Sequence, residues 1–263
     1  MKIISLGLGM QSTAMYLMSS VGLLDRANFA IFADPGAEYD QTYKLLDDLK
    51  NWSKQKNGID IIVCSENNLY KDLVKGENSS GQRFAGIPAF STYKGQKGMI
   101  RRQCTSEYKI KPVMKKIREL HGLKKYQRNK PSEVWLGISM DEIQRMKTSL
   151  IYNVEYVYPL IEKRLSRKDC QKYLSEMGFN DVIKSACVFC PYHGNRDWKR
   201  LKNTNPKGWS QAVKVDESIR NSLINRGREG ELFLHRSLKP LKDAYLQEDQ
   251  EELFMCEEGY CGI

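Results

Sequence analysis

The chain has 263 residues, of which 41% are hydrophobic and 28% charged, and 42 basic against 32 acidic residues give a formal net charge of +10 at pH 7. This composition is typical of a globular chain long enough to bury a sizeable core, and it excludes a low-complexity protein. No apolar run approaches the length of a membrane span and the start of the chain does not read as a signal peptide, so we expect a cytoplasmic protein with no membrane partner. In that compartment the seven cysteines are expected to be thiols or metal ligands.

Strand-like and helical patterns alternate along the first 165 residues. Apolar runs predict strands, and amphipathic spacing predicts helices at 12–24 and 39–58. The strands are expected at 2–8, 28–34, 59–65 and 133–139. This alternation predicts an α/β fold in which a parallel sheet carries helices on both faces.

The second half of the chain has a different character. Residues 166–263 are predicted to form a mainly helical region that contains cysteines, with Ser166 as the N-cap of its first helix and Gly178 at that helix's end. We therefore expect two parts, an α/β domain at 1–165 and a helical part at 166–263. Between the third and fourth predicted strands, residues 76–101 are rich in Gly, Ser and Lys and are expected to be a long loop.

A glycine-containing turn, "SLGLGMQST" at 5–13, joins the first predicted strand to the first predicted helix. It lacks the lysine of a Walker A loop, and Ser12 stands where a dinucleotide fingerprint has its third glycine. Glycines allow backbone N–H groups to approach an oxyanion, hydroxyls add donors, and the helix N-terminus contributes a positive dipole. The pattern therefore predicts a phosphate-binding turn, with an ordinary strand–helix turn as the alternative.

This turn resembles the PP-loop of the adenine nucleotide α-hydrolase superfamily, which includes ATP pyrophosphatases and phosphoadenosine phosphosulfate reductases. Its usual form is Ser-Gly-Gly-x-Asp-Ser, and here Gln11 stands in place of the acid. Four later segments resemble the reductases in the same order: "FADPGAEYDQTY", "RRQCTSEYKIKP", "LGISMDEIQRMKTS" and "YPLIEKRLSRKDC". In the first of them Pro35 replaces a threonine.

The resemblance spans residues 3–173 and implies a Rossmann-like α/β fold that binds an adenine nucleotide, either phosphoadenylyl sulfate or ATP. It implies that the nucleotide is held by Ser5, Gly7, Gly9, Gln11, Ser12, Thr13, Asp34, Arg101, Arg102, Lys109, Gly137, Glu142 and Arg145. Arginine forks and lysine ammonium groups suit phosphate and sulfate oxygens, although each of these cations could instead be an ordinary surface residue.

The cysteines allow three models. Cys187 and Cys190 form a Cys-x-x-Cys pair, and Cys256 and Cys261 form a second pair near the end of the chain. These four could hold zinc or an iron–sulfur cluster. Alternatively Cys104, Cys187 and Cys190 could hold a [4Fe-4S] cluster, with Cys256 at the fourth position or that position open, which resembles the assimilatory adenylyl-sulfate reductases. In the third model all of them are thiols without a metal.

The ending "GYCGI" resembles the reductases' segment that carries a nucleophilic cysteine, so Cys261 is a candidate nucleophile and Cys104 a second candidate catalytic thiol. One hypothesis is therefore an oxidoreductase that reduces phosphoadenylyl or adenylyl sulfate to sulfite with a thioredoxin-like or other thiol donor.

Two further hypotheses keep the fold but change the activity. In the second, an ATP pyrophosphatase-type transferase with an iron–sulfur cluster uses ATP, and hence magnesium, to modify a tRNA or DNA base by thiolation-type chemistry. Residues 94–130 favour a nucleic-acid partner because they contain thirteen Lys or Arg and only two acids. In the third, the replacement of the loop acid by Gln11 indicates a nucleotide-binding module without catalytic activity.

Overall fold

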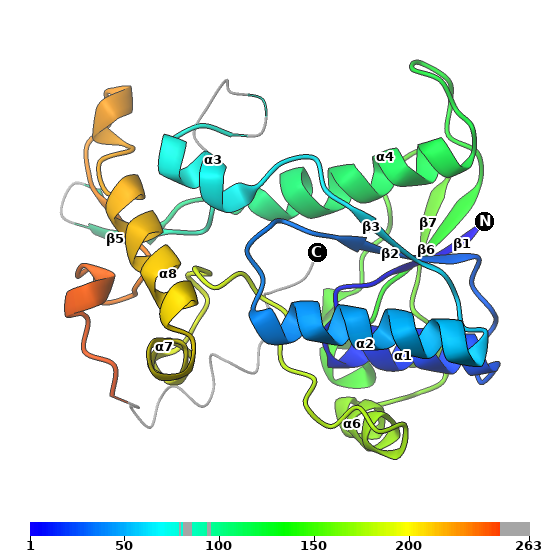
Figure 1. Ribbon diagram of the computed structural model, residues 1–263. Coiled ribbons are helices and arrows are strands. Elements are labelled where there is room, and N and C mark those ends of the chain that lie inside the picture. Colours follow the sequence, from blue (N-terminus) through cyan, green and yellow to red (C-terminus); the bar gives the residue numbers. More distant parts are fainter. Residues whose placement is uncertain (79, 81–85, 94–95, 248–263) are drawn as a thin grey trace. The chain divides into compact units, whose positions relative to one another are not determined.

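The computed structural model describes residues 1–78, 80, 86–93 and 96–247 (Figure 1). They form two compact units, each assembled from three separate segments of the chain. Unit 1 contains Met1–Asp34, Asp40–Cys64 and Lys111–Ser185, and unit 2 contains Pro35–Tyr39, Ser65–Ile110 and the chain from Ala186 onward. The predicted boundary at residue 165 falls inside the third segment of unit 1.

Unit 1 is built on a five-stranded parallel sheet with the order β3-β2-β1-β6-β7. The strands are β1 (Lys2–Ser5), β2 (Phe29–Ala33), β3 (Ile61–Cys64), β6 (Ser132–Trp135) and β7 (Val154–Val157). The first three lie within the predicted runs, and β6 begins one residue before the run predicted at 133–139. The fifth, β7, was not predicted, because four residues that alternate only weakly in polarity carry little signal without the neighbouring strand.

Helices cover both faces of this sheet, which confirms the predicted fold class. Figure 1 shows α1 and α2 on one face and α4 on the other. Unit 1 contains α1 (Met10–Val21), α2 (Asp40–Lys56), α4 (Lys111–Leu120), α5 (Pro159–Glu162), α6 (Arg167–Glu176) and the 3-10 segment η2 (Met140–Arg145). Helix α6 begins as predicted, because the Ser166 hydroxyl accepts the Asp169 N–H while the Asp169 carboxylate accepts the Ser166 N–H.

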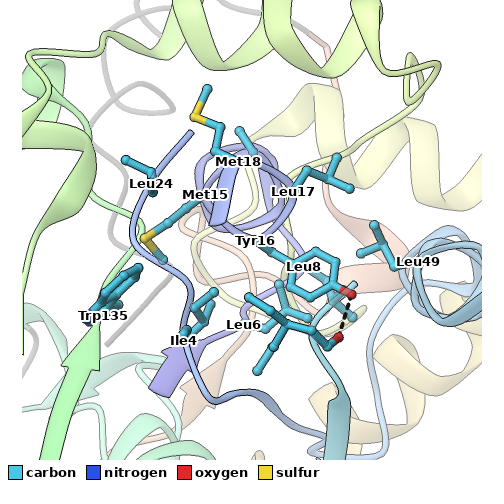
Figure 2. Close-up of a cluster of buried hydrophobic side chains, with 14 of the residues drawn as sticks. Ile4, Leu6, Leu8, Met15, Tyr16, Leu17, Met18, Leu24, Leu49 and Trp135 are labelled. Carbon is cyan, nitrogen blue, oxygen red and sulfur yellow. Dashed lines mark hydrogen bonds between the residues drawn. The ribbon is translucent and has the colours of Figure 1, made fainter. Parts of the chain in front are cut away.

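The hydrophobic core of unit 1 lies between α1 and the sheet (Figure 2). Residues of β1 and of the turn after it, such as Ile4 and Leu8, pack against Met15 and Leu17 of α1 and are almost completely buried. Each such side chain contributes roughly 1.5–3 kcal/mol to folding. Tyr16, also buried, donates its hydroxyl to the carbonyl of Ile59 at 2.8 Å. This core fixes the position at which α1 begins.

Unit 2 combines a small antiparallel sheet with helices. The sheet has the order β5-β4-β8, with β4 (Phe90–Tyr93), β5 (Gln96–Met99) and β8 (Leu232–Phe233), so part of the predicted long loop forms a pair of strands. The helices are α3 (Leu69–Lys75), the π-helix η1 (Ser106–Ile110), α7 (Asn195–Thr204), α8 (Pro206–Ile219), and the 3-10 turns η3 (Ile224–Arg226) and η4 (Leu241–Asp243). Among the described residues no helix is long and apolar enough to span a membrane.

Candidate functional site

The carboxyl ends of β1 and β6 form the topological switch point of the parallel sheet. From β1 the chain runs to β2 and β3 on one side, and it returns later as β6 and β7 on the other. Ligands of open α/β sheets bind in the crevice outside the strand ends at this point. The turn after β1 and the segment after β6 are therefore the two chain segments that such a ligand would meet.

The turn after β1 brings strained backbone to the start of α1. Gly9 is the N-cap of α1, and the Ser12 hydroxyl accepts the Gly9 N–H at 3.3 Å. Leu8 is fully buried and has a φ of 57°, in the left-handed region that costs a non-glycine residue roughly 1–2 kcal/mol. Such strain concentrates at ligand-binding and catalytic sites, where surrounding packing holds it in place.

Thr13, in the first turn of α1, carries a buried side-chain hydroxyl that makes no hydrogen bond to the described residues. The residue is completely buried, and its Oγ1 has no hydrogen-bond partner among the described residues. A buried hydroxyl without a partner costs about 1–3 kcal/mol, so it calls for an explanation.

The segment after β6 packs tightly against the beginning of α1. A Cβ atom at Gly137 would lie 2.7 Å from both the backbone N and the Cα of Ser12, so only glycine fits there. This contact joins the two segments of the predicted nucleotide site directly. The sequence resemblance predicted Gly137 and Ser12 as site residues, and the structure brings them together.

A polar chain of Gln11, Glu142 and Arg145 also joins the two segments. The Gln11 side-chain amide donates to the Glu142 carboxylate at 3.3 Å, and the Arg145 guanidinium pairs with the same carboxylate at 2.8 Å. Glu142 is buried, with 7% of its surface exposed. A carboxylate therefore stands beside Gln11.

Two further predicted residues lie at strand ends of the same sheet. Ser5 is the last residue of β1, and Asp34 directly follows β2. The Asp34 carboxylate accepts the Tyr43 hydroxyl of α2 at 2.8 Å. Together with Gly7, these residues complete the part of the predicted nucleotide site that belongs to unit 1.

The other predicted cations, Arg101, Arg102 and Lys109, belong to unit 2. Lys109 lies in the π-helix η1 and pairs with the Glu38 carboxylate at 3.0 Å. The Glu38 side chain is fully buried. The backbone of Glu38 forms an isolated antiparallel β-bridge with that of Cys187. Sequence reasoning did not single out Glu38, because Asp34 and Asp40 lie close to it in the chain and nothing in the local pattern distinguishes the acid that is buried.

The Cys187–Cys190 pair forms a tight turn in unit 2. The Cys190 N–H donates to the Cys187 carbonyl at 3.0 Å, and the Val188 N–H donates to the Ala37 carbonyl at 2.9 Å. Next to this turn, burial raises the pKa of the Tyr39 hydroxyl, and the charges of Asp197 and Cys190 act in the same direction. Cys104 is half-buried in the same unit, where its N–H donates to the Gly86 carbonyl at 2.9 Å.

The predicted metal ligands are only partly within the described chain. Cys256 and Cys261 lie outside the described residues. Within residues 1–247, apart from the gaps, no group of three or more His, Cys, Asp or Glu side chains is placed to hold a metal ion. Cys170, buried on α6, is a structural thiol, since burial raises its pKa to about 12.

Unit 1 is thus a Rossmann-like α/β domain with a candidate phosphate-binding turn at the switch point of its sheet. No protein-family model matches the chain, and a search of curated proteins finds no match either.

Proposed function

We propose that unit 1 binds the anionic end of an adenine nucleotide between the β1–α1 turn and the segment after β6. The observation that carries this proposal is the meeting of Gln11 and Glu142, which are 131 positions apart in the sequence, at the sheet's switch point. The N-terminus of α1 would supply backbone donors and a positive dipole to phosphate or sulfate oxygens. The strained turn at Leu8 and the hydroxyl of Thr13 further support a ligand at this place.

For the chemistry, we propose the reductive cleavage of phosphoadenylyl or adenylyl sulfate. The Cys261 thiolate would attack the sulfur atom, forming an S–S bond while the S–O bond to the nucleotide phosphate breaks and the nucleotide leaves. A second thiol, from Cys104 or a thioredoxin-like donor, would then attack the Cys261 sulfur. This releases sulfite and leaves a disulfide, so the two thiols supply the two electrons. The resemblance of "GYCGI" to the reductase ending supports this assignment.

Sulfite release from adenylyl sulfate and from phosphoadenylyl sulfate, with dithiothreitol or thioredoxin as donor, tests this reaction. We expect Cys261→Ser to abolish release. Cys170→Ala is the matched control and should retain release, because Cys170 is buried and its raised pKa keeps it protonated. Equal activity of Cys261→Ser and the wild type would refute the proposed nucleophile.

Nucleotide binding is tested separately from the chemistry. By titration calorimetry, Ser12→Ala should weaken the binding of ATP or of adenylyl sulfate at least tenfold. Ser218→Ala, which removes a hydroxyl that bonds the Lys214 carbonyl in α8, is the matched control and should leave binding unchanged. If both variants bind nucleotide like the wild type, the turn is not the phosphate site.

A second candidate is favoured by the Glu142 carboxylate beside Gln11. It provides an acid at the loop where the usual one is missing, and a carboxylate is the group with which such a loop would hold magnesium on ATP phosphates. ATP-dependent modification of a nucleic-acid base then becomes the reaction, and Glu142→Gln should abolish pyrophosphate release from ATP in the presence of tRNA or DNA. Nucleotide binding without sulfite or pyrophosphate release would favour the binding module.

We propose that an iron–sulfur cluster or zinc takes its ligands from Cys104, Cys187, Cys190, Cys256 and Cys261. A cysteine that acts as a thiol in the reductase reaction, Cys261 or Cys104, is not a ligand in that candidate. Metal analysis of anaerobically purified protein distinguishes a cluster, a zinc site and thiols without a metal. Iron with charge-transfer absorption supports a cluster, stoichiometric zinc supports a structural site, and neither metal supports thiols.

A further inference from the structure

We propose that two adjacent loops of unit 1 form a binding surface for single-stranded nucleic acid. The first loop, residues 123–130, follows α4, and the second, residues 146–153, leads into β7 (Figure 1). We call them together the two-loop surface. This proposal goes beyond the nucleotide site and is independent of which nucleotide reaction occurs there.

Hydrogen bonds hold the two loops in a defined arrangement. The Arg118 guanidinium at the end of α4 donates to the carbonyls of Lys124 and Gln127 and to the Asn129 side chain, at 2.6–2.9 Å. The Asn129 amide donates to the Tyr152 carbonyl at 3.2 Å, and the Asn153 amide donates to the Asn129 carbonyl at 2.9 Å. The surface is therefore built before any ligand arrives, which lowers the entropic cost of binding.

Two tyrosine rings are presented to solvent on this frame. Tyr126 is 90% exposed and has a φ of 69°, a left-handed conformation that is a genuine outlier for a bulky residue. The turn that imposes it is closed by Gln127, whose side chain accepts the Lys124 N–H at 2.7 Å. Tyr152 on the second loop is 59% exposed. Exposed rings of this kind are platforms on which unstacked bases can lie.

Cations accompany both rings. The Lys125 ammonium lies 5.1 Å from the Tyr126 ring centre, and the Arg128 guanidinium lies 5.9 Å from that of Tyr152. The two loops contain five basic residues and no acidic one: Lys124, Lys125, Arg128, Lys130 and Lys147. The acids that flank the first loop are engaged elsewhere, since Glu119 pairs with Lys116 and Glu133 accepts the indole N–H of Trp135.

The combination of cations and exposed aromatic rings indicates which class of ligand the two-loop surface binds. A positive surface by itself fits any polyanion, but alternating cations and exposed rings fit a phosphate backbone with accessible bases. In a duplex the base faces are stacked on one another and unavailable to the tyrosines. Leu150 on the second loop is completely exposed and adds apolar area for a base or sugar. Single-stranded RNA or DNA is therefore the favoured ligand.

The test measures binding of the full chain to a labelled 12-nucleotide RNA, and to the DNA of the same sequence, by fluorescence anisotropy. The corresponding duplexes, heparin and phosphatidylserine vesicles are compared with these single strands. We expect Tyr126→Ala and Tyr152→Ala each to weaken single-strand binding about 5- to 150-fold. Tyr245→Ala removes a tyrosine that is 68% exposed in unit 2, so it is the matched control and should bind like the wild type. Tyr126→Asn, which tolerates the left-handed backbone, guards against a folding defect.

Charge variants provide a second readout. The double variant Lys125→Gln/Arg128→Gln should reduce the slope of log affinity against log salt by about 1.4, or about 0.7 per phosphate contact. Wild-type affinity in both tyrosine variants overturns the proposal, as does equal or tighter binding of duplex, heparin or vesicles. Because Ser12→Ala is expected to impair nucleotide binding alone, and the tyrosine variants strand binding alone, failure of one proposal is distinguishable from failure of the other.

Discussion

The close approach of Gly137 to Ser12 gives the most direct test of the candidate phosphate site. In Gly137→Ala, the new Cβ would lie 2.7 Å from two backbone atoms of Ser12, about 0.7 Å inside ordinary van der Waals contact. Backbone cannot yield as a flexible side chain does, so the segment after β6 and the start of α1 must separate. Overpacking of this kind costs about 1–3 kcal/mol of folding free energy.

The same separation would displace Ser12 and Gln11 from Glu142. Because a misplacement approaching 1 Å can cost on the order of a hundredfold in a preorganised site, we expect nucleotide affinity to fall by about 10- to 100-fold. Urea unfolding should show a midpoint lowered by about 0.5–1.5 M, for a slope of about 2 kcal/mol per molar. Calorimetric titration with ATP and adenylyl sulfate measures the loss of binding.

Gly7→Ala is the matched control for stability in the same turn. A Cβ there would lie 3.7 Å from the Ser12 hydroxyl oxygen, which is ordinary contact, so the unfolding midpoint should change little. If Gly137→Ala is as stable as Gly7→Ala and binds nucleotide like the wild type, the close contact does not shape a binding site and the reasoning is refuted.

Three further predictions concern buried polar groups. Asp216 is 1% exposed, pairs with Arg220 and accepts two backbone N–H groups. Asp216→Leu should therefore destabilise unit 2 by about 3–5 kcal/mol. Urea unfolding measures this loss, and an unchanged midpoint would contradict it. Burial lowers the pKa of His235 in the folded protein to about 4, from 6.5 in the unfolded chain. The neutral His235 side chain therefore contributes its full stability above pH 6.5, and this contribution is lost as the pH falls toward 4. Between pH 7 and pH 5 the free energy of unfolding should fall by up to about 2 kcal/mol more in the wild type than in His235→Gln. Thr13→Val replaces the buried unpaired hydroxyl by a methyl group; it should stabilise the free protein by about 1 kcal/mol but weaken nucleotide binding, and a loss of stability would show that the hydroxyl serves the fold.

The positively charged stretch at 94–130 is split between the two units. The sequence predicted one continuous basic region that could bind a nucleic-acid partner. The structure divides it, because residues up to Ile110 belong to unit 2 and those from Lys111 belong to unit 1. Within unit 1, the second part lies beside Tyr152. Sequence reasoning did not consider Tyr152 because it is 26 positions from Tyr126 along the chain.

The sequence by itself determined the local features of this protein. Four of the five parallel strands, the glycine turn before α1 and the cap at Ser166 follow from patterns within a few residues of one another. Hydrophobic periodicity and capping act over such short distances, so they are visible without a partner segment.

Only the tertiary structure decided which distant segments meet. The pairing of β7, the contact of Gly137 with Ser12, the bond between Gln11 and Glu142, and the interleaving of the two units join positions far apart in the chain. These arrangements are selected by the packing and hydrogen bonding of the whole domain, which no single stretch of sequence encodes.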